Sequence, residues 1–283
     1  MSARLRAVAQ RTEEIVAAGR YRSPGGREVA IAAAVEAARD GTRMYGPGPV
    51  EVPPVAPADT LIEVTGESSL EAARRLPGPA AVLNFASARN PGGGYLNGAQ
   101  AQEESLCRAS ALHTCLLRAR AFYEHHRAHR DPFYTDRVIH SPAVPVFRDD
   151  GGRLLDTPYT AGFLTAAAPN AGVVLRREPG RAGGLPAALS ARAERVLETA
   201  AAHGYRRLVL GAWGCGVFRN DPAQVAGAFH ALLAREGGRF AGYFEHVVLG
   251  VLDRTPGAVV RAAFERTFTD AAPVGPTAGH RQP

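Results

Sequence analysis

The chain has 283 residues, 46% of them hydrophobic, so it can bury a full core as one large domain or two small ones. Its formal charge is +6, and all 33 basic residues are arginine because the chain contains no lysine. Schiff-base enzymes and Walker A phosphate loops both need a lysine, so both classes are excluded. The basic balance suits a polyanionic partner, and it equally suits a merely solvated arginine-rich surface.

The cysteine pattern and the hydropathy indicate the cellular compartment in which we expect the protein. Cys107, Cys115 and Cys215 are odd in number and have no CxxC spacing, which argues against a disulfide framework or a zinc ribbon. No apolar run approaches the roughly 18 residues that span a bilayer, and the N-terminus leads into an amphipathic helix instead of a signal peptide. We therefore expect a cytoplasmic protein without membrane contact.

The N-terminal region has a helical pattern. Apolar spacing predicts helices over residues 5–18 and 27–39, which end at Gly19 and Gly41. Residues 45–57 are too rich in proline and glycine for regular structure. We expect residues 1–59 to form a helical extension followed by a connector.

From residue 60 the chain alternates short apolar runs with helical patterns. Strands are predicted at 61–65, 80–85, 137–140, 144–147, near 162–165, 207–210 and 246–252. Helices are predicted at 68–76, 100–126, 189–203, 222–235 and 256–268. This alternation predicts an α/β domain over residues 60–270, with a largely parallel sheet covered on both faces, and a disordered tail over 271–283. In such sheets ligands bind outside the carboxyl ends of the strands.

A first glycine-rich loop follows the predicted strand 80–85. Gly92, Gly93 and Gly94 allow positive φ and a close approach of backbone to ligand, and they precede a helix that begins with Gln102, Glu103 and Glu104. The free N–H groups of a helix start suit an anionic or oxygen-rich ligand, and the paired carboxylates bring acid–base chemistry to it. This stretch predicts a catalytic loop.

A second glycine-rich loop follows the predicted strand 207–210. It contains Gly211, Gly214 and Gly216, and a helix opens after it with Asn220 or Asp221 as the N-cap. Its backbone N–H groups over residues 214–218 can wrap a diphosphate without a lysine. It is not a Rossmann fingerprint, because Arg219 stands where the third glycine belongs.

Other motifs give weaker evidence for a functional site. His125 and His129 have metal-ligand spacing on a helix, yet no further ligand set accompanies them, so a solvated helix end is the better interpretation. Cys215 lies in an N–H-rich loop with no base nearby in sequence, and we interpret it as a packing residue. No G-x-S-x-G elbow is present.

The two loops together resemble the bacterial-type poly(ADP-ribose) glycohydrolases, which have a macrodomain fold. The resemblance rests on Gly92-Gly-Gly94, Gln102-Glu-Glu104 and the downstream Gly214-Cys-Gly-Val-Phe218. It extends through Ala18-Gly-Arg-Tyr21, Gly26-Arg-Glu28 and residues 82–91 to most of residues 4–268. It implies a macrodomain-like α/β/α sandwich with a mixed, largely parallel sheet and an N-terminal helical extension.

The resemblance also implies an activity: hydrolysis of the ribose–ribose O-glycosidic bonds of poly(ADP-ribose), mainly from the chain end, with release of ADP-ribose. By it, Glu104 is the catalytic acid and Glu103 holds the ribose hydroxyls. The substrate-binding residues it implies are Ser87, Asn90, Gly92, Gly93, Gly94, Gln102, Gly214, Cys215, Gly216, Val217 and Phe218. The strand end at residues 65–67 is a candidate for the adenine side, and neither a metal nor another cofactor is implied.

The residues constrain the chemistry. Consecutive helical side chains point about 100° apart, so Glu103 and Glu104 cannot face each other across one bond like the usual glycosidase pair. We therefore expect Glu104 alone to act as acid and then as base. A helix N-terminus lowers the pKa of a carboxyl, whereas the neighbouring Glu103 and a bound diphosphate raise it, which predicts a pH optimum that depends on substrate charge.

The residues leave three other functions open. The chain could be a macrodomain that binds ADP-ribose without cleaving it, a hydrolase of mono-ADP-ribosylated protein or ADP-ribose phosphate, or a structural or nucleic-acid-binding protein. The expected partners are poly(ADP-ribose), ADP-ribose and poly(ADP-ribosyl)ated proteins. We expect no direct nucleic-acid binding, and a monomer.

Overall fold

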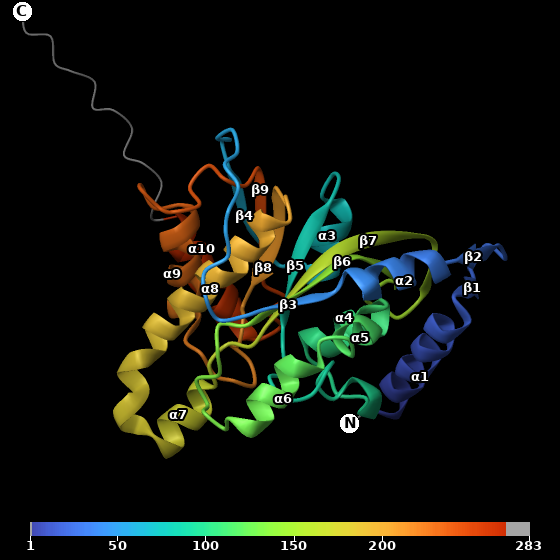
Figure 1. Ribbon diagram of the computed structural model, residues 1–283, viewed down its shortest axis with the longest axis horizontal. Helices are drawn as coiled ribbons and strands as arrows, with labels where there is room; N and C mark the ends of the chain where they lie inside the picture. The colour runs from blue at the N-terminus through green and yellow to red at the C-terminus, as the bar shows by residue number, and fades with distance from the viewer. Residues whose placement is uncertain (1, 270–283) are drawn as a thin grey trace, which may run out of the picture.

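A mixed sheet forms the centre of the protein in a computed structural model that describes residues 2–269 (Figure 1). Seven strands of the described chain make this sheet in the order β3-β6-β7-β5-β8-β9-β4. The neighbours from β7 to β4 pair in parallel, while β6 pairs antiparallel with both β3 and β7. The tail predicted to be disordered, 271–283, lies outside the described residues.

The elements have the following bounds. The strands are β1 (Arg20–Arg22), β2 (Glu28–Ala30), β3 (Arg43–Tyr45), β4 (Leu61–Thr65), β5 (Ala80–Phe85), β6 (Val138–Arg148), β7 (Leu154–Ala166), β8 (Arg207–Gly211) and β9 (His246–Gly250). The α-helices are α1 (Ala3–Ala18), α2 (Ala32–Gly41), α3 (Ser69–Arg75), α4 (Gln102–Ala109), α5 (Leu112–Leu116), α6 (Arg120–Ala128), α7 (Ala171–Arg177), α8 (Leu185–Ala202), α9 (Pro222–Leu233) and α10 (Val259–Thr269). Short 3₁₀ turns are η1 (Tyr95–Asn97), η2 (Pro179–Gly184) and η3 (Pro256–Ala258).

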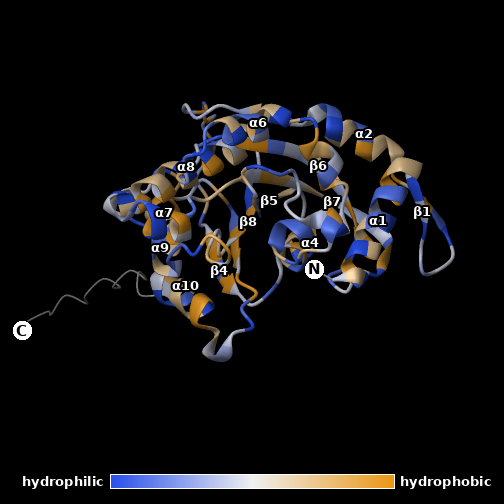
Figure 2. Cartoon of the chain, turned by 90° about the horizontal axis from the view of Figure 1, so that it is seen from below, coloured by the Kyte–Doolittle hydropathy of each residue, from blue (hydrophilic) through white to orange (hydrophobic). Residues whose placement is uncertain are grey.

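Helices cover both faces of the sheet, because alternate strand residues point to opposite sides. In β5, Ala80 and Val82 belong to the core beneath the first six helices, while Ala81 and Leu83 belong to the core beneath α8, α9 and α10. Figure 2 shows the central strands largely hydrophobic and the helices striped. The prediction of an α/β/α sandwich with a mixed, largely parallel sheet is confirmed.

The N-terminal region differs in part from the prediction. The helix expected over 27–39 begins only at Ala32, because residues 28–30 pair with residues 20–22 as an antiparallel hairpin around the turn at Gly25 and Gly26. Strand β3 then joins the edge of the main sheet. Residues on both sides of position 60 share one hydrophobic core. The division of the chain at residue 60 into an extension and an α/β domain therefore stays a prediction.

The long helix expected over 100–126 is three helices instead. Ser110 adopts an extended conformation and forms a β-bridge with Val146, and its hydroxyl accepts a hydrogen bond from the N–H of Leu112. Contact with a strand far along the chain therefore overrides the local helical pattern. The two short strands expected at 137–147 form a single strand, β6, with a register shift between Ser141 and Val144.

Candidate active site

The two glycine loops leave adjacent parallel strands at the same edge of the sheet. Strand β5 pairs in parallel with β8, so residues 86–101 and 212–221 emerge side by side. A Cβ placed on Gly211 would lie 3.3 Å from the ring of Phe85, so the two strand ends are in contact. The carboxyl-edge location expected from the sequence is where the loops lie.

Gln102 ties the first turn of α4 to the end of β5. Its side-chain oxygen accepts a hydrogen bond from the N–H of Phe85 at 2.9 Å, and its nitrogen donates to the carbonyl of Leu83 at 2.8 Å. The same nitrogen donates to the hydroxyl of Ser69 on α3 at 3.0 Å. The amide therefore orients the helix turn that carries the two glutamates.

Glu103 is buried, and both of its carboxyl oxygens are occupied. Its side chain is 3% exposed. One oxygen accepts from the N–H of Ser87 at 2.7 Å and the other from the Asn84 amide at 3.3 Å. Burial raises the pKa of Glu103 to about 8 although these hydrogen bonds lower it. Near neutral pH this carboxyl therefore holds a proton for much of the time.

Glu104 has a different environment although it is the next residue. It is 8% exposed, and its Oε1 accepts a hydrogen bond from the N–H of Gly94 at 2.9 Å. Its Oε2 is buried and has no hydrogen-bond partner among the described residues. A buried polar atom without a partner is uncommon and marks a position where a ligand or strain is expected.

The glycine run lets the loop lie directly over the carboxyls. Gly93 has φ +59°, and a Cβ placed there would lie 2.5 Å from Glu104 Oε1 and 3.1 Å from Glu103 Oε2. Any larger residue at this position would displace the two carboxyl groups. The structure thus places the predicted residues Gly92 to Gly94 beside both glutamates.

Ser87 and Asn90, two of the substrate-binding residues that the resemblance implies, lie at the start of the same loop. The N–H of Ser87 is committed to Glu103, and its hydroxyl accepts from the N–H of Asn90 at 3.2 Å. Asn90 is exposed at the turn before the glycines. Their contact with a sugar stays a prediction.

The second loop presents free backbone donors. The N–H groups of Gly214, Gly216, Val217 and Phe218 donate to no acceptor among the described residues. Asn220 braces the loop from inside, since its amide donates to the carbonyls of Pro169 at 2.8 Å and Gly214 at 3.2 Å. Successive free N–H groups of this kind form an anion-binding concavity.

The side chains of the second loop differ in exposure. Val217 is 81% exposed, whereas Phe218 is partly buried, with its ring centroid 5.8 Å from that of Tyr134. Burial raises the pKa of Cys215 to about 12, which argues against a reactive thiolate there. Tyr134 itself has φ +56°, and the sequence did not indicate its contact with this loop.

Helix α1 braces the catalytic loop from behind, through residues that the sequence did not single out. The Tyr95 hydroxyl donates to the carbonyl of Ala9 at 3.1 Å and to Glu13 at 3.0 Å. Glu13 also lies 3.2 Å from Nδ1 of His113, and the N–H of Ser2 donates to the carbonyl of Gly98. These contacts are about 80 to 100 residues apart in sequence, so no local motif reveals them.

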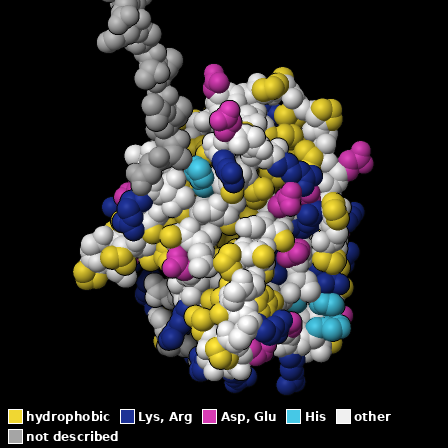
Figure 3. All heavy atoms as spheres, turned by 90° about the vertical axis from the view of Figure 1, so that its left-hand side faces the viewer, with side chains coloured by type: hydrophobic (Ala, Val, Ile, Leu, Met, Phe, Trp, Pro, Cys, Tyr) yellow, Lys and Arg dark blue, Asp and Glu magenta, His cyan; other side chains and the backbone are white. Residues whose placement is uncertain are grey.

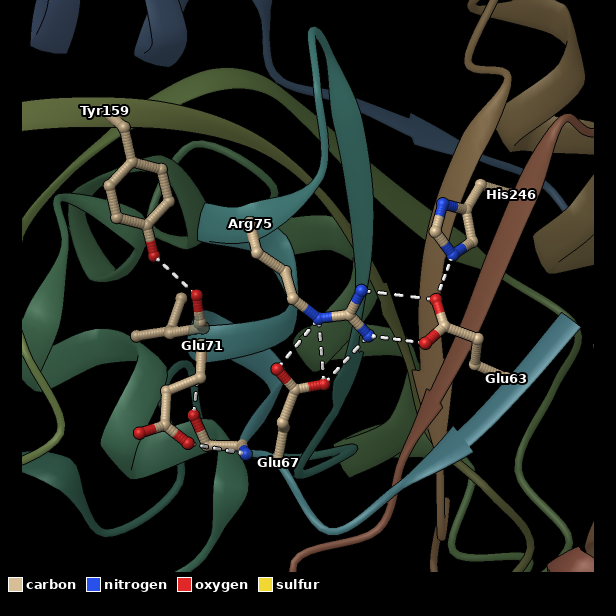
Figure 4. Close-up of polar contacts among 8 residues, drawn as sticks. Glu63, Glu67, Glu71, Arg75, Tyr159 and His246 are labelled. Carbon is tan, nitrogen blue, oxygen red and sulfur yellow. Dashed lines mark hydrogen bonds and ion pairs between the residues drawn. The ribbon is translucent and has the colours of Figure 1, made fainter. Parts of the chain in front are cut away.

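The strand end proposed for the adenine side carries an ion-pair network (Figure 4). Arg75 of α3 lies between Glu67 and Glu63, at 2.8 Å and 3.2 Å, and His246 contacts Glu63 from the other side. The hydrogen bonds from Arg75 lower the pKa of both glutamates. Glu67 is thereby engaged by protein, and an adenine contact at residues 65–67 stays a prediction.

Neither a metal cluster nor a membrane span is found in the described part of the chain. No group of three or more His, Cys, Asp or Glu side chains in residues 2–269 is arranged to hold a metal ion. His125 and His129 stack with ring centroids 4.1 Å apart. No helix within this range is both long and apolar enough to cross a bilayer.

Comparison with solved structures places this site in a family. The poly(ADP-ribose) glycohydrolase of Thermomonospora curvata is 49% identical, with a TM-score of 0.88 and coverage of 94% of this chain and 100% of that one. The chain belongs to the bacterial poly(ADP-ribose) glycohydrolases. The family model described as the microbial-type PARG catalytic domain matches residues 9–149 of the chain, a range that contains the first loop and both glutamates.

A second structure of the same enzyme and a structure of another family member were solved with ligands. The Thermomonospora curvata enzyme bound to the inhibitor ADP-HPD is 49% identical, with a TM-score of 0.86 and coverage of 94% of this chain and 100% of that chain. The Deinococcus radiodurans enzyme in complex with ADP-ribose is 44% identical, with a TM-score of 0.76 and coverage of 83% of this chain and 97% of that chain. A comparison with curated protein sequences found no match. The resemblance seen in the two loops is thus confirmed at the level of family and fold.

Proposed function

We propose that the chain hydrolyses the ribose–ribose O-glycosidic bonds of poly(ADP-ribose), mainly from the chain end, and releases ADP-ribose. Membership of the glycohydrolase family supports this activity. The roles of the two residues are assigned from one observation: the two adjacent buried carboxyls differ in their hydrogen bonds, and only Glu104 has an oxygen without a partner among the described residues. The activity and the roles of the two residues can each be tested by experiment.

Glu104 is the general acid in this proposal. Cleavage through an oxocarbenium-like transition state requires a proton for the leaving ribose oxygen and a base for the incoming water. Oε2 of Glu104 is the carboxyl oxygen without a protein partner among the described residues, so no hydrogen bond within the protein competes for its proton. After the leaving group departs, the same oxygen accepts a proton from water, so one residue serves both steps.

Glu103 is the orienting residue. Its pKa of about 8 would by itself favour it as the acid, but its two oxygens already accept hydrogen bonds from Ser87 and Asn84. A proton on Glu103 also removes the repulsion that two neighbouring carboxylates would exert on each other. Glu103 therefore fixes the loop and the sugar while Glu104 performs the proton transfer.

The second loop holds the diphosphate. Its four free N–H groups supply neutral donors, which compensate for the absence of lysine in this chain. Phe218 packs against the terminal ribose beside them, with Tyr134 behind it. The scissile bond then lies between the diphosphate loop and Glu104.

The test is release of ADP-ribose from purified poly(ADP-ribose) by the wild type, Glu104→Gln and Glu103→Gln, followed by chromatography. Glu104→Gln should lower kcat by at least about 100-fold while ADP-ribose binding persists, because general acid–base catalysis contributes about that much. Glu103→Gln should mainly raise KM. Glu71→Gln, which alters the exposed capping box of α3, is the matched control and should keep full activity.

Several outcomes separate the alternatives. A loss below about tenfold for Glu104→Gln, or a larger kcat loss for Glu103→Gln, would reject the division of roles. If the wild type binds ADP-ribose but releases no product, the chain is a macrodomain that binds ADP-ribose without cleaving it. Release from mono-modified protein but not from polymer would make it a mono-ADP-ribosyl hydrolase. Cleavage from the chain end predicts that end-labelled polymer releases labelled ADP-ribose monomers, whereas cleavage within the chain releases labelled oligomers.

Partners and compartment complete the proposal. ADP-ribose and poly(ADP-ribosyl)ated proteins are the expected ligands, and the chain acts as a monomer in the cytoplasm. All three cysteines are free, two of them buried, which suits a reducing compartment. Fractionation of cells and light scattering of the purified chain test these two points.

A further inference from the structure

A surface cavity lies where helices α2, α5 and α6 meet, and none of its lining residues belongs to either glycine loop. It has a volume of about 440 Å³ and is lined by Arg39, Thr114, Leu117, Arg118, Arg120 and Ala121. Three of its six lining residues are arginines, and none is acidic. Three like charges around one cavity repel one another unless a counter-ion lies between them.

The arginines of this cavity, which we call the three-arginine cavity, have no ion-pair partner in the described chain. Arg39, Arg118 and Arg120 form no salt bridge and no side-chain hydrogen bond among residues 2–269. Each is exposed, so its guanidinium is available to a ligand. The nearby acidic residues Glu36 and Glu124 lie on α2 and α6 but do not line the cavity.

The start of α6 adds to the positive potential. Arg120 and Ala121 are the first two residues of this nine-residue helix, whose N-terminal N–H groups carry partial positive charge. Guanidinium groups bind phosphate oxygens in a planar, bidentate manner, and the Thr114 hydroxyl can donate as well. The chemistry of the lining therefore matches a phosphate or diphosphate group.

The place of the cavity in the fold relates it to the catalytic turn. Glu104 lies in the first turn of α4, and α5 and α6 follow directly, with α4 in contact with α5. Leu106 of α4, Leu112 of α5 and Phe122 of α6 belong to the same hydrophobic core, and Figure 1 shows the three helices following one another along the chain. We propose that the three-arginine cavity is a non-catalytic subsite for a diphosphate of the polymer, beyond the unit held in the active site; it rests on the proposed function.

Other basic parts of the surface lack this combination. A second cavity of about 280 Å³ is lined by Arg4, Arg11 and Arg148, but the Arg148 guanidinium already donates to Thr12 and to the carbonyl of Gly152. Its other two lining residues, Ala7 and Val8, are apolar, so it has no hydroxyl donor beside the arginines. On the face in Figure 3, which carries α7 to α10, basic and acidic side chains are interspersed. Elsewhere in the chain, Arg239 pairs with Glu194 and Glu198.

The experiment measures binding of long-chain poly(ADP-ribose), ADP-ribose and inorganic pyrophosphate to protein that carries Glu104→Gln, so that polymer is not consumed. The test variant adds Arg39→Gln, Arg118→Gln and Arg120→Gln. The matched control adds Arg176→Gln, Arg235→Gln and Arg266→Gln, which remove the same charge from exposed arginines that line neither cavity. Unfolding temperatures of both triple variants verify the fold.

The test variant should bind long-chain polymer about tenfold or more weakly and lose one pyrophosphate site, while its affinity for ADP-ribose stays unchanged. In the otherwise wild-type chain, the same three changes should raise KM for long polymer and leave kcat unaltered. Unchanged polymer affinity, or an equal loss in the control variant, would overturn the inference.

Failure of the proposed function gives a different result. If the wild type releases no ADP-ribose but the test variant still loses polymer affinity relative to the control, the proposed function fails and the subsite stands. If the wild type releases ADP-ribose and both triple variants bind polymer alike, the subsite fails and the proposed function stands.

Discussion

Gly93→Ala tests whether the glycine run sets the position of the catalytic carboxyls. The residue has φ +59°, and a Cβ there would lie 2.5 Å from Glu104 Oε1, whereas ordinary contact begins at 3.4 Å. Glu104 must therefore retreat by about 1 Å, and a displacement of that size can cost about 100-fold in rate. We expect kcat/KM for ADP-ribose release to fall by about that factor.

Stability should fall as well. The left-handed backbone costs a non-glycine residue roughly 1–2 kcal/mol, and loss of the hydrogen bond from Gly94 to Glu104 adds about 1 kcal/mol. The expected decrease in the free energy of unfolding is therefore roughly 2–3 kcal/mol, measured by urea titration.

The matched control is Gly204→Ala. Gly204 has φ +72°, yet an added Cβ there meets nothing within 4 Å. It should carry the backbone strain, roughly 1–2 kcal/mol, with full activity. The reasoning is refuted if Gly93→Ala keeps an activity within about threefold of Gly204→Ala, a difference of less than about 1 kcal/mol in the activation free energy.

Three further predictions concern the surroundings of the catalytic loop. Because burial raises the pKa of Glu103 to about 8, the folded state retains a proton that the unfolded chain releases above pH 4.5; its contribution to stability is complete below pH 4.5 and is lost as pH rises toward 8. Between those values the free energy of unfolding of the wild type should fall relative to that of Glu103→Gln by about 1.4 kcal/mol per pH unit, as measured by urea titration at each pH. The same pH dependence of the free energy of unfolding in both proteins would contradict this prediction. Tyr95→Phe removes the hydrogen bonds to Ala9 and Glu13 and should cost about 1–2 kcal/mol in thermal unfolding, with a modest loss of activity; an unchanged melting temperature would argue against bracing by α1. Asn220→Ala should weaken ADP-ribose binding in calorimetry by about tenfold or more with little change in kcat, since its amide holds the second loop; a loss confined to kcat would place it elsewhere in the mechanism.

Much of this protein could be predicted from local sequence. The apolar run of β5, the proline and glycine punctuation, and the helix-opening pair Asn220 and Asp221 are short-range signals, and the strand and helix they predicted are present. The adjacent pair Glu103 and Glu104 behind a glycine run, with a second loop downstream, also indicated the family from local sequence. These features depend on neighbours within a few residues, which is why the chain reveals them directly.

Tertiary structure alone decided the features that depend on residues far apart. Ser110 leaves the helical pattern because it meets Val146 of β6, and the hairpin of β1 and β2 replaces the start of a predicted helix. The unequal environments of the two glutamates arise in the same way. Identical residues at consecutive positions differ because Ser87 and Asn84 occupy both oxygens of one, whereas Gly94 occupies a single oxygen of the other, and only the folded chain brings these donors to them.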